Sequence, residues 1–291
     1  MIYIITPVYN RKDFTQNYLK ALQNQTNKNF KVVIVDDGST DGTSEMIESD
    51  FPNVILLKEK GDLWWAEATN VGVRYALEKG ASYIMTLNDD TIPYENYIEM
   101  MYYWIKEEPN SLFGALAIDE KTNEIAYGGE IYHWNNGQST FLHSTLQKEE
   151  QKGIHEVNIF PGRGLLIPSE VFKNIGLYDS KNFPQTVADN DFAFRAINNG
   201  YKIYTNYDAK IKIFTNESAV QRIWKNRTIK NYFFHILNKR GGGNIVYFTK
   251  VAIKNCPKRY LIQHLFIGLT KRIFGYHIYW LLETLKLKSK G

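Results

Sequence analysis

Cysteines, clustered histidines and glycine-rich nucleotide motifs are scarce in this 291-residue sequence, and each scarcity excludes a class of protein. The only cysteine, Cys256, excludes a disulfide framework and a cysteine-based zinc site. The six histidines are scattered, so a histidine-built metal centre is not expected. No G-x-G-x-x-G segment follows the first predicted strand, which argues against a dehydrogenase.

Long apolar runs are lacking as well. The uncharged runs Tyr260–Thr270 and Ile273–Leu282 are separated by two cations, and both are shorter than the roughly 18–20 residues of a spanning helix. The N-terminal residues MIYIITPVYN have no cationic n-region and are predicted to form a strand rather than a signal peptide. We therefore expect a cytoplasmic protein, located peripherally at the inner face of the cell membrane.

The charge is divided unevenly along the chain. From Arg222 to Gly291 the sequence has 15 Lys or Arg and a single acid, Glu283, whereas the other residues have 20 basic and 30 acidic groups. A positive region of this size predicts contact with an anionic surface, and the candidates are a membrane and a nucleic acid.

The first 120 residues alternate between strand and helix patterns. Strands are predicted over Ile2–Thr6, Lys31–Val35, Val54–Leu57 and Ser82–Leu87, and helices over Arg11–Gln23, Ala66–Glu78 and Tyr94–Lys106. Asn10 is expected to cap the first helix. This order predicts an α/β fold with a mostly parallel open sheet, whose ligands lie beyond the carboxyl ends of the strands.

Polar clusters follow three of these strands: Thr6–Asn10, Asp36–Gly42 and Asn88–Asp90. Turn chemistry alone explains such clusters in many proteins. Turn chemistry alone does not explain the pair Asp89–Asp90, because adjacent carboxylates repel each other unless a cation balances their charge. Oxygen ligands without His or Cys favour Mg²⁺ or Mn²⁺, usually shared with phosphates. A diphosphate-bearing substrate is therefore expected.

The segments TPVYN, VDDGSTDGT and LNDD at this spacing resemble family 2 glycosyltransferases of GT-A fold. The segment Gly61–Gly72, with its Trp-Trp pair, is similar to one bacterial branch that includes rhamnosyltransferases and other enzymes of polysaccharide biosynthesis. Two later segments, Gly162–Pro168 and Ala188–Phe192, resemble motifs of that branch. The resemblance implies a GT-A catalytic domain over 1–220, with a nucleotide-sugar half over 1–120 and an acceptor half over 121–220. Residues 221–291 then form a basic, amphipathic, helical extension.

The resemblance also implies roles for individual residues. Asp189 is the expected general base, which takes the proton of the acceptor hydroxyl in an inverting displacement. Asp90 is the expected metal ligand, and Asp89 is expected to contact the metal or the ribose. The other residues expected to bind the nucleotide sugar are Thr6, Pro7, Tyr9, Asp37, Asn70 and Asn88.

Several assignments remain open. Asp191 is the alternative to Asp189 as base, and it is also a candidate for contact with the sugars. Trp64 and Trp65 either stack on a sugar or pack in the core. Arg163 is a candidate to meet the donor diphosphate or the acceptor.

The C-terminal region contains apolar residues at helical spacing, accompanied by Lys and Arg: Ile262, Phe266, Leu269, Ile273, Tyr276 and Trp280. Such a stripe either packs on the protein core or lies in a membrane surface, and the accompanying cations favour an anionic membrane. Nucleic acid is not expected, since no helix-turn-helix, RRM or finger pattern occurs. The sequence leaves open whether the chain forms a homodimer.

The leading hypothesis is a metal-dependent inverting glycosyltransferase. It moves a hexosyl or rhamnosyl group from a UDP- or dTDP-linked donor to a polyprenyl-diphosphate-linked glycan, as in capsule or O-antigen synthesis. One alternative is a non-catalytic, degenerate transferase that only binds nucleotide sugar or glycan. A sugar nucleotidyltransferase is a weaker alternative, because the first strand is not followed by a Gly-rich basic loop.

Overall fold

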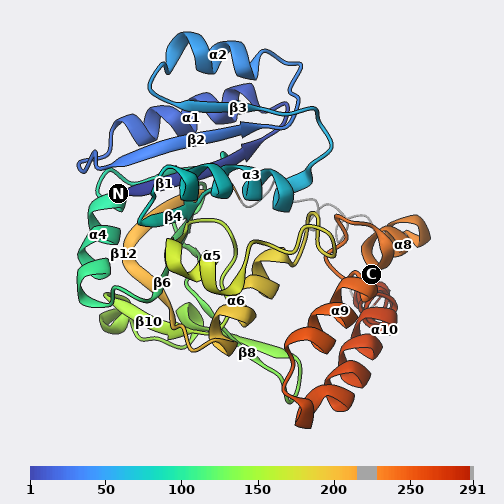
Figure 1. Ribbon diagram of the computed structural model, residues 1–291. Coiled ribbons are helices and arrows are strands. Elements are labelled where there is room, and N and C mark those ends of the chain that lie inside the picture. Colours follow the sequence, from blue (N-terminus) through green and yellow to red (C-terminus); the bar gives the residue numbers. More distant parts are fainter. Residues whose placement is uncertain (215–227, 289–291) are drawn as a thin grey trace.

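A computed structural model describes residues 1–214 and 228–288 (Figure 1). The N-terminal half contains, in chain order, β1 (Ile2–Val8), α1 (Lys12–Gln23), β2 (Phe30–Asp36), α2 (Thr43–Asp50), β3 (Ile55–Lys58), α3 (Trp64–Glu78), β4 (Tyr83–Thr86), β5 (Thr91–Pro93), α4 (Tyr97–Glu107) and β6 (Leu112–Asp119). The helices and strands predicted for this half are present, with ends that differ by up to three residues. Asn10 does not cap α1; its side chain accepts a hydrogen bond from the Thr40 N–H instead.

The rest of the described chain adds further strands and the C-terminal helices. They are β7 (Ile125–Tyr127), β8 (Glu130–His133), β9 (Gln138–Phe141), β10 (Ile154–Val157), β11 (Leu165–Pro168), α5 (Ser169–Ile175), α6 (Ala188–Asn198), β12 (Ile203–Ile213), α8 (Ile229–Leu237), α9 (Ile245–Asn255) and α10 (Leu261–Lys288). Strands β8 and β9 form a separate hairpin.

The main sheet has the strand order β10-β12-β6-β11-β4-β1-β2-β3. Strands β3, β2, β1 and β4 are parallel, as are β6 and β12, while β11 runs antiparallel between β4 and β6. The predicted open, mostly parallel α/β sheet is therefore confirmed.

Alternating side chains of β1 enter two different cores, as the two-residue period of a strand requires. Tyr3 and Ile5 belong to a core that includes α3, α5 and α6, whereas Ile2, Ile4 and Val8 belong to one that includes α1, α2 and α4. The sheet is thus covered on both faces, and its polar groups emerge where the parallel strands end.

The helices α8, α9 and α10 pack together beside α6 and the β8–β9 hairpin (Figure 1). Within residues 1–214 and 228–288, no helix combines the length and apolar character required to cross a membrane. Although α10 has 28 residues, cations such as Lys271 and Arg272 interrupt its apolar sequence.

Candidate functional site

The indole of Trp65 connects three loops at the carboxyl edge of the sheet. The indole N–H donates to Asn88 Oδ1 (3.1 Å), and the backbone N–H of Trp65 donates to Gln185 Oε1 (3.2 Å). Its ring lies against Gly162 so closely that a Cβ there would be 2.4 Å from the ring. The ring also packs edge-on against Tyr178. Trp65 is therefore a packing residue that positions its neighbours.

Asp189 lies in the first turn of α6, beside this tryptophan-centred cluster. The Gly162 N–H donates to Asp189 Oδ2 (3.1 Å), and the Asn190 N–H donates to Asp189 Oδ1 (2.9 Å). Burial raises the pKa of Asp189, although these two donors and the nearby Arg163 partly offset the rise. A partly buried carboxylate of raised basicity suits proton abstraction near neutral pH. The general-base role of Asp189 stays a prediction.

Asp191, two residues further along α6, has a different environment. Its side chain is fully buried, and Oδ2 accepts from Arg195 Nε (2.8 Å) and Lys254 Nζ (3.0 Å). Oδ1 accepts from Asn255 Nδ2 (2.9 Å). The suggested sugar contact by Asp191 is therefore corrected: both of its oxygens are used inside the protein, where they join α6 to α9.

Two further expectations change because the side chains are already occupied. Asn70 is 2% exposed and exchanges hydrogen bonds with the backbone of Tyr178 (2.9 and 3.0 Å), so it holds that loop and does not face a nucleotide. Thr6 is fully buried and hydrogen-bonds Tyr18 (2.7 Å) in the core. Pro7 is partly exposed and Tyr9 is exposed, so these two remain available at the end of β1.

The predicted base-pocket carboxylate, Asp37, is 9% exposed after β2. It accepts hydrogen bonds from the Leu63 N–H (3.1 Å to Oδ2) and the Trp64 N–H (3.3 Å), so it holds the entry to α3. Gly38 and Gly61 pack together here, and a Cβ on Gly38 would lie 2.9 Å from the Gly61 Cα. Trp64 adopts φ 62°, a left-handed conformation that is uncommon for a bulky residue.

The predicted metal pair is asymmetric. Arg11 Nε lies 2.9 Å from both carboxylate oxygens of Asp89, and the Thr15 hydroxyl donates to Oδ2 (3.2 Å). Burial raises the pKa of Asp89 to about 6, with Arg11 opposing and Asp90 adding to the rise. Asp89 thus holds Arg11 and does not offer unpaired oxygens to a metal.

Asp90 differs from its neighbour. Its Oδ1 is buried and has no hydrogen-bond partner among the residues the structure describes. An orphaned carboxylate oxygen fits a cation. The described residues contain no group of three or more His, Cys, Asp or Glu suited to a metal, so diphosphate oxygens and water would have to complete the coordination.

Sequence reasoning missed the cations that the C-terminal region brings to this edge. Lys239 Nζ lies 4.9 Å and the Arg240 guanidinium carbon 5.2 Å from the centre of the Trp64 ring. The Lys239 carbonyl accepts from the Thr186 hydroxyl (3.2 Å), which fixes the loop beside α6. The sequence signal for these two cations was the run Lys-Arg-Gly-Gly-Gly at 239–243. Arg11, directly after TPVYN, was a similar signal for a cation in the N-terminal half.

Comparison with solved structures identifies the class of fold. The chain superposes on TarS residues 1–349 from S. aureus with a TM-score of 0.61 at 14% identity, covering 94% of this chain and 72% of that one. GalNAc-T7 with UDP, GalNAc and Mn²⁺ gives a TM-score of 0.62 at 15% identity, over 93% and 57% of the two chains. The fold is that of the GT-A glycosyltransferases.

Sequence comparison then places the chain in a family. Residues 3–175 match the profile of "Glycosyl transferase family 2", so the chain belongs to that family. Glycosyltransferase GlyG of Streptococcus pneumoniae is 27% identical over 63% of this chain and 62% of its own length. The dTDP-rhamnosyl transferase RfbF of Shigella flexneri is 24% identical over 76% and 71%. This chain spans only 28% of an uncharacterized glycosyltransferase of Rickettsia conorii that is 27% identical.

The different environments of the two α6 carboxylates predict unequal effects of their substitution on the free energy of unfolding. Asp191→Asn should lower the free energy of unfolding by about 1–3 kcal/mol, because it weakens charge-assisted bonds to Arg195 and Lys254. Asp189→Asn should lower it less at pH 7. The amide can accept only one of the two backbone N–H groups that Asp189 accepts, but burial raises the Asp189 pKa, so the stabilising contribution of this group is lost as pH rises through the folded pKa and the ionised form has little stability to lose. Urea unfolding of both variants measures this, and equal losses would contradict the distinction.

Proposed function

We propose that this protein is a metal-dependent inverting glycosyltransferase that transfers a sugar from a nucleoside-diphosphate donor to a lipid-linked glycan. The single observation that carries the proposal is the Trp65 connection, which places Asn88 of the expected donor site and Gly162, the hydrogen-bond donor to Asp189, around one indole. Donor binding and proton abstraction then occur at one edge of the sheet. TarS, which shares the fold, has been crystallised with UDP and with UDP-GlcNAc, and RfbF is a dTDP-rhamnosyl transferase; these similarities support a UDP- or dTDP-linked donor.

In the proposed mechanism the chain's own residues divide the work. Asp189 accepts the proton of the acceptor hydroxyl as that oxygen attacks the anomeric carbon. Asp90 would hold Mg²⁺ or Mn²⁺, which when bound neutralises charge on the diphosphate. Lys239 and Arg240, which lie against Trp64, would add positive charge near the leaving group. Arg11 holds Asp89 and thereby positions the loop that carries Asp90.

Removing the carboxylate of Asp90, whose Oδ1 has no hydrogen-bond partner among the described residues, tests the donor site. Asp90→Asn should abolish Mn²⁺-dependent binding of UDP and dTDP while the melting temperature of the free protein stays near that of the wild type, because this side chain is partly exposed. Calorimetric titration of each nucleotide with Mn²⁺ and with EDTA provides the measurement. Glu48→Gln, at an exposed ion pair with Lys58, is the matched control. Unchanged Mn²⁺-dependent affinity in Asp90→Asn would remove Asp90 from the site.

Turnover tests the base. Asp189→Asn should keep donor affinity but lower kcat by roughly 10²–10⁴-fold, the usual contribution of a general base. Single-turnover assays with a panel of nucleotide sugars and polyprenyl-diphosphate-linked acceptors measure the effect. Near-normal turnover in this variant would show that another group takes the proton. Donor binding by the wild type without turnover on any acceptor would favour the non-catalytic, degenerate transferase.

The C-terminal helices support placing this activity at the inner face of the cell membrane. Ile262 and Phe266, predicted members of the apolar stripe, are 85% and 72% exposed, while Leu269 and Ile273 are half-buried. The side chains of Tyr276 and Trp280 lie outside the described residues. Other exposed apolar side chains of α8, α9 and α10 are Ile229, Phe233, Leu237, Val246, Ile253, Phe274 and Ile278. With the positive charge of this region, such a surface favours an anionic bilayer.

Vesicle binding tests this placement. Ile262→Ser combined with Phe266→Ser should weaken binding to phosphatidylglycerol-rich vesicles by at least about tenfold, because less apolar surface enters the bilayer. Salt should weaken binding of the intact protein, because exposed charges are screened over about 8–10 Å. Tyr103→Ser, at an aromatic residue on α4 that is 54% exposed, should bind like the wild type. Co-sedimentation measures all three, and an intact protein that ignores anionic vesicles at low salt would defeat the idea.

A further inference from the structure

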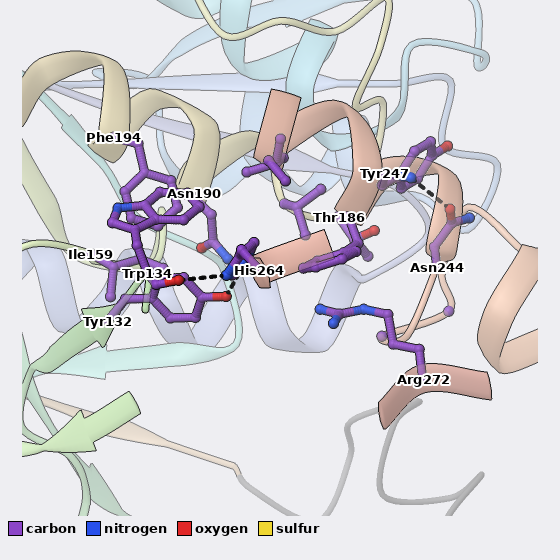
Figure 2. Close-up of a pocket in the computed structure, with 16 residues that line it drawn as sticks. Tyr132, Trp134, Ile159, Thr186, Asn190, Phe194, Asn244, Tyr247, His264 and Arg272 are labelled. Carbon is purple, nitrogen blue, oxygen red and sulfur yellow. Dashed lines mark hydrogen bonds between the residues drawn. The ribbon is translucent and has the colours of Figure 1, made fainter. Parts of the chain in front are cut away.

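A cavity of about 80 Å³ opens between the N-terminal end of α6, the helix that carries the expected base, and the C-terminal helices. Thr186, Val187 and Asn190, which flank Asp189 in the chain, contribute to its wall. Figure 2 shows that α9 and α10 supply the facing wall. Val187 has φ 62°, which is unusual for a β-branched residue and marks a constrained backbone next to the catalytic helix.

The lining combines aromatic surface with a few fixed polar groups, as ligand sites do. The aromatic rings belong to Tyr132, Trp134, Phe194, Tyr247 and Phe248. The two ring nitrogens of His264 are engaged by the Trp134 carbonyl (3.1 Å) and the Tyr132 hydroxyl (3.2 Å), as drawn in Figure 2. Burial lowers the pKa of His264, so this imidazole is neutral and adds no charge to the cavity.

Arg272 is the charged member of the lining. Its guanidinium extends from α10 into the cavity in Figure 2 and lies 3.7 Å from the centre of the Phe248 ring. One nitrogen donates to the Gly268 carbonyl (3.2 Å), while Nε is buried without a hydrogen-bond partner. In residues 1–214 and 228–288, no carboxylate forms an ion pair with Arg272, in contrast to Arg195 on Asp191.

A partly buried cation with an unsatisfied Nε and no counterion among the described residues is costly, because the desolvation of the guanidinium is not offset by an ion pair. Cation–π contact with Phe248 offsets only part of that cost. An arginine fork matches the oxygens of a phosphate or a carboxylate, and such charge-assisted bonds are the strong ones. A bound anion would satisfy the buried Nε and neutralise the charge.

We propose that this cavity is an acceptor subsite in which Arg272 binds an anionic group, a phosphate or a carboxylate, next to the sugar whose hydroxyl faces Asp189. The inference rests on the proposed function, which it deepens by naming the acceptor class: a negatively charged glycan. The anion has two chemical sources, the diphosphate of a lipid-linked acceptor or an acidic sugar. The aromatic rings around it would contact the apolar faces of the sugar.

The test measures binding directly and requires no turnover, so it is readable even if sugar transfer fails. Three small probes are titrated in EDTA, which prevents metal-mediated phosphate binding at Asp90: glucose 1-phosphate, methyl β-glucuronide and the uncharged methyl β-glucoside. Ligand-observed NMR gives the dissociation constants. Wild-type protein should bind at least one charged probe about 10- to 100-fold more tightly than the uncharged one, as expected for hydrogen bonds between charged groups.

Variants assign the effect to Arg272. Arg272→Met keeps an apolar stem over Phe248 and should reduce the charged probe to the affinity of the uncharged one, while Arg272→Lys should restore part of the difference. Arg259→Met removes an exposed guanidinium that also lies on an aromatic ring, Tyr260, but does not line the cavity, so it should behave as the wild type. A preference for glucose 1-phosphate would identify the acceptor diphosphate as the source, and a preference for the glucuronide would identify an acidic sugar.

Two results would overturn the proposal. The first is a wild-type protein that binds all three probes equally, a result that does not depend on any variant folding. The second is an Arg272→Met protein that keeps its preference for the charged probe, or that loses affinity for charged and uncharged probes alike together with a lower melting temperature. That outcome would make Arg272 a packing residue between α9 and α10.

Discussion

The site depends on one side chain, the indole of Trp65, because it connects the loops that carry Asn88, Gly162 and Gln185. Its N–H fixes Asn88, its backbone reaches Gln185, and its ring leaves room only for glycine at 162. The Gly162 N–H in turn holds Asp189. An aromatic ring at a strand-to-helix junction thus acts as a rigid spacer, and rigid spacing is what positions reacting groups within bonding distance.

A second constraint attaches the C-terminal helices to this site. The fully buried Asp191 binds Arg195, Lys254 and Asn255, and it ties α9 to α6, the helix that carries Asp189. Because breaking such a buried cluster leaves uncompensated charge, α9 is held firmly in place. The loop bearing Lys239 and Arg240 then covers Trp64, and α10 completes the cavity at the N-terminal end of α6. The C-terminal region therefore packs against the candidate site and also forms the exposed apolar and basic surface.

Much of the candidate site was predictable because parallel strands bring their carboxyl ends together. Asp37, Asn88 and Asp90 follow β2 and β4, so their common edge was expected. The antiparallel insertion of β11 was not expected; its register pairs Leu165 with Thr86 and so sets the glycines before it beside Asn88. Thr6 and Asn70 were assigned to the nucleotide because motif position carries no information on burial.

By itself, the sequence determined the order of strands and helices, since two- and 3.6-residue periods of apolar side chains are local properties. It also determined which loops contain carboxylates and that the C-terminal region is basic. Only the tertiary structure decided how each carboxylate is used. Asp189 and Asp191 share the first turn of one helix, yet two of the three side chains that occupy Asp191, Lys254 and Asn255, come from 63 and 64 positions away in the chain. Such distant pairing depends on how helices pack, and packing follows from the whole core rather than from any local pattern.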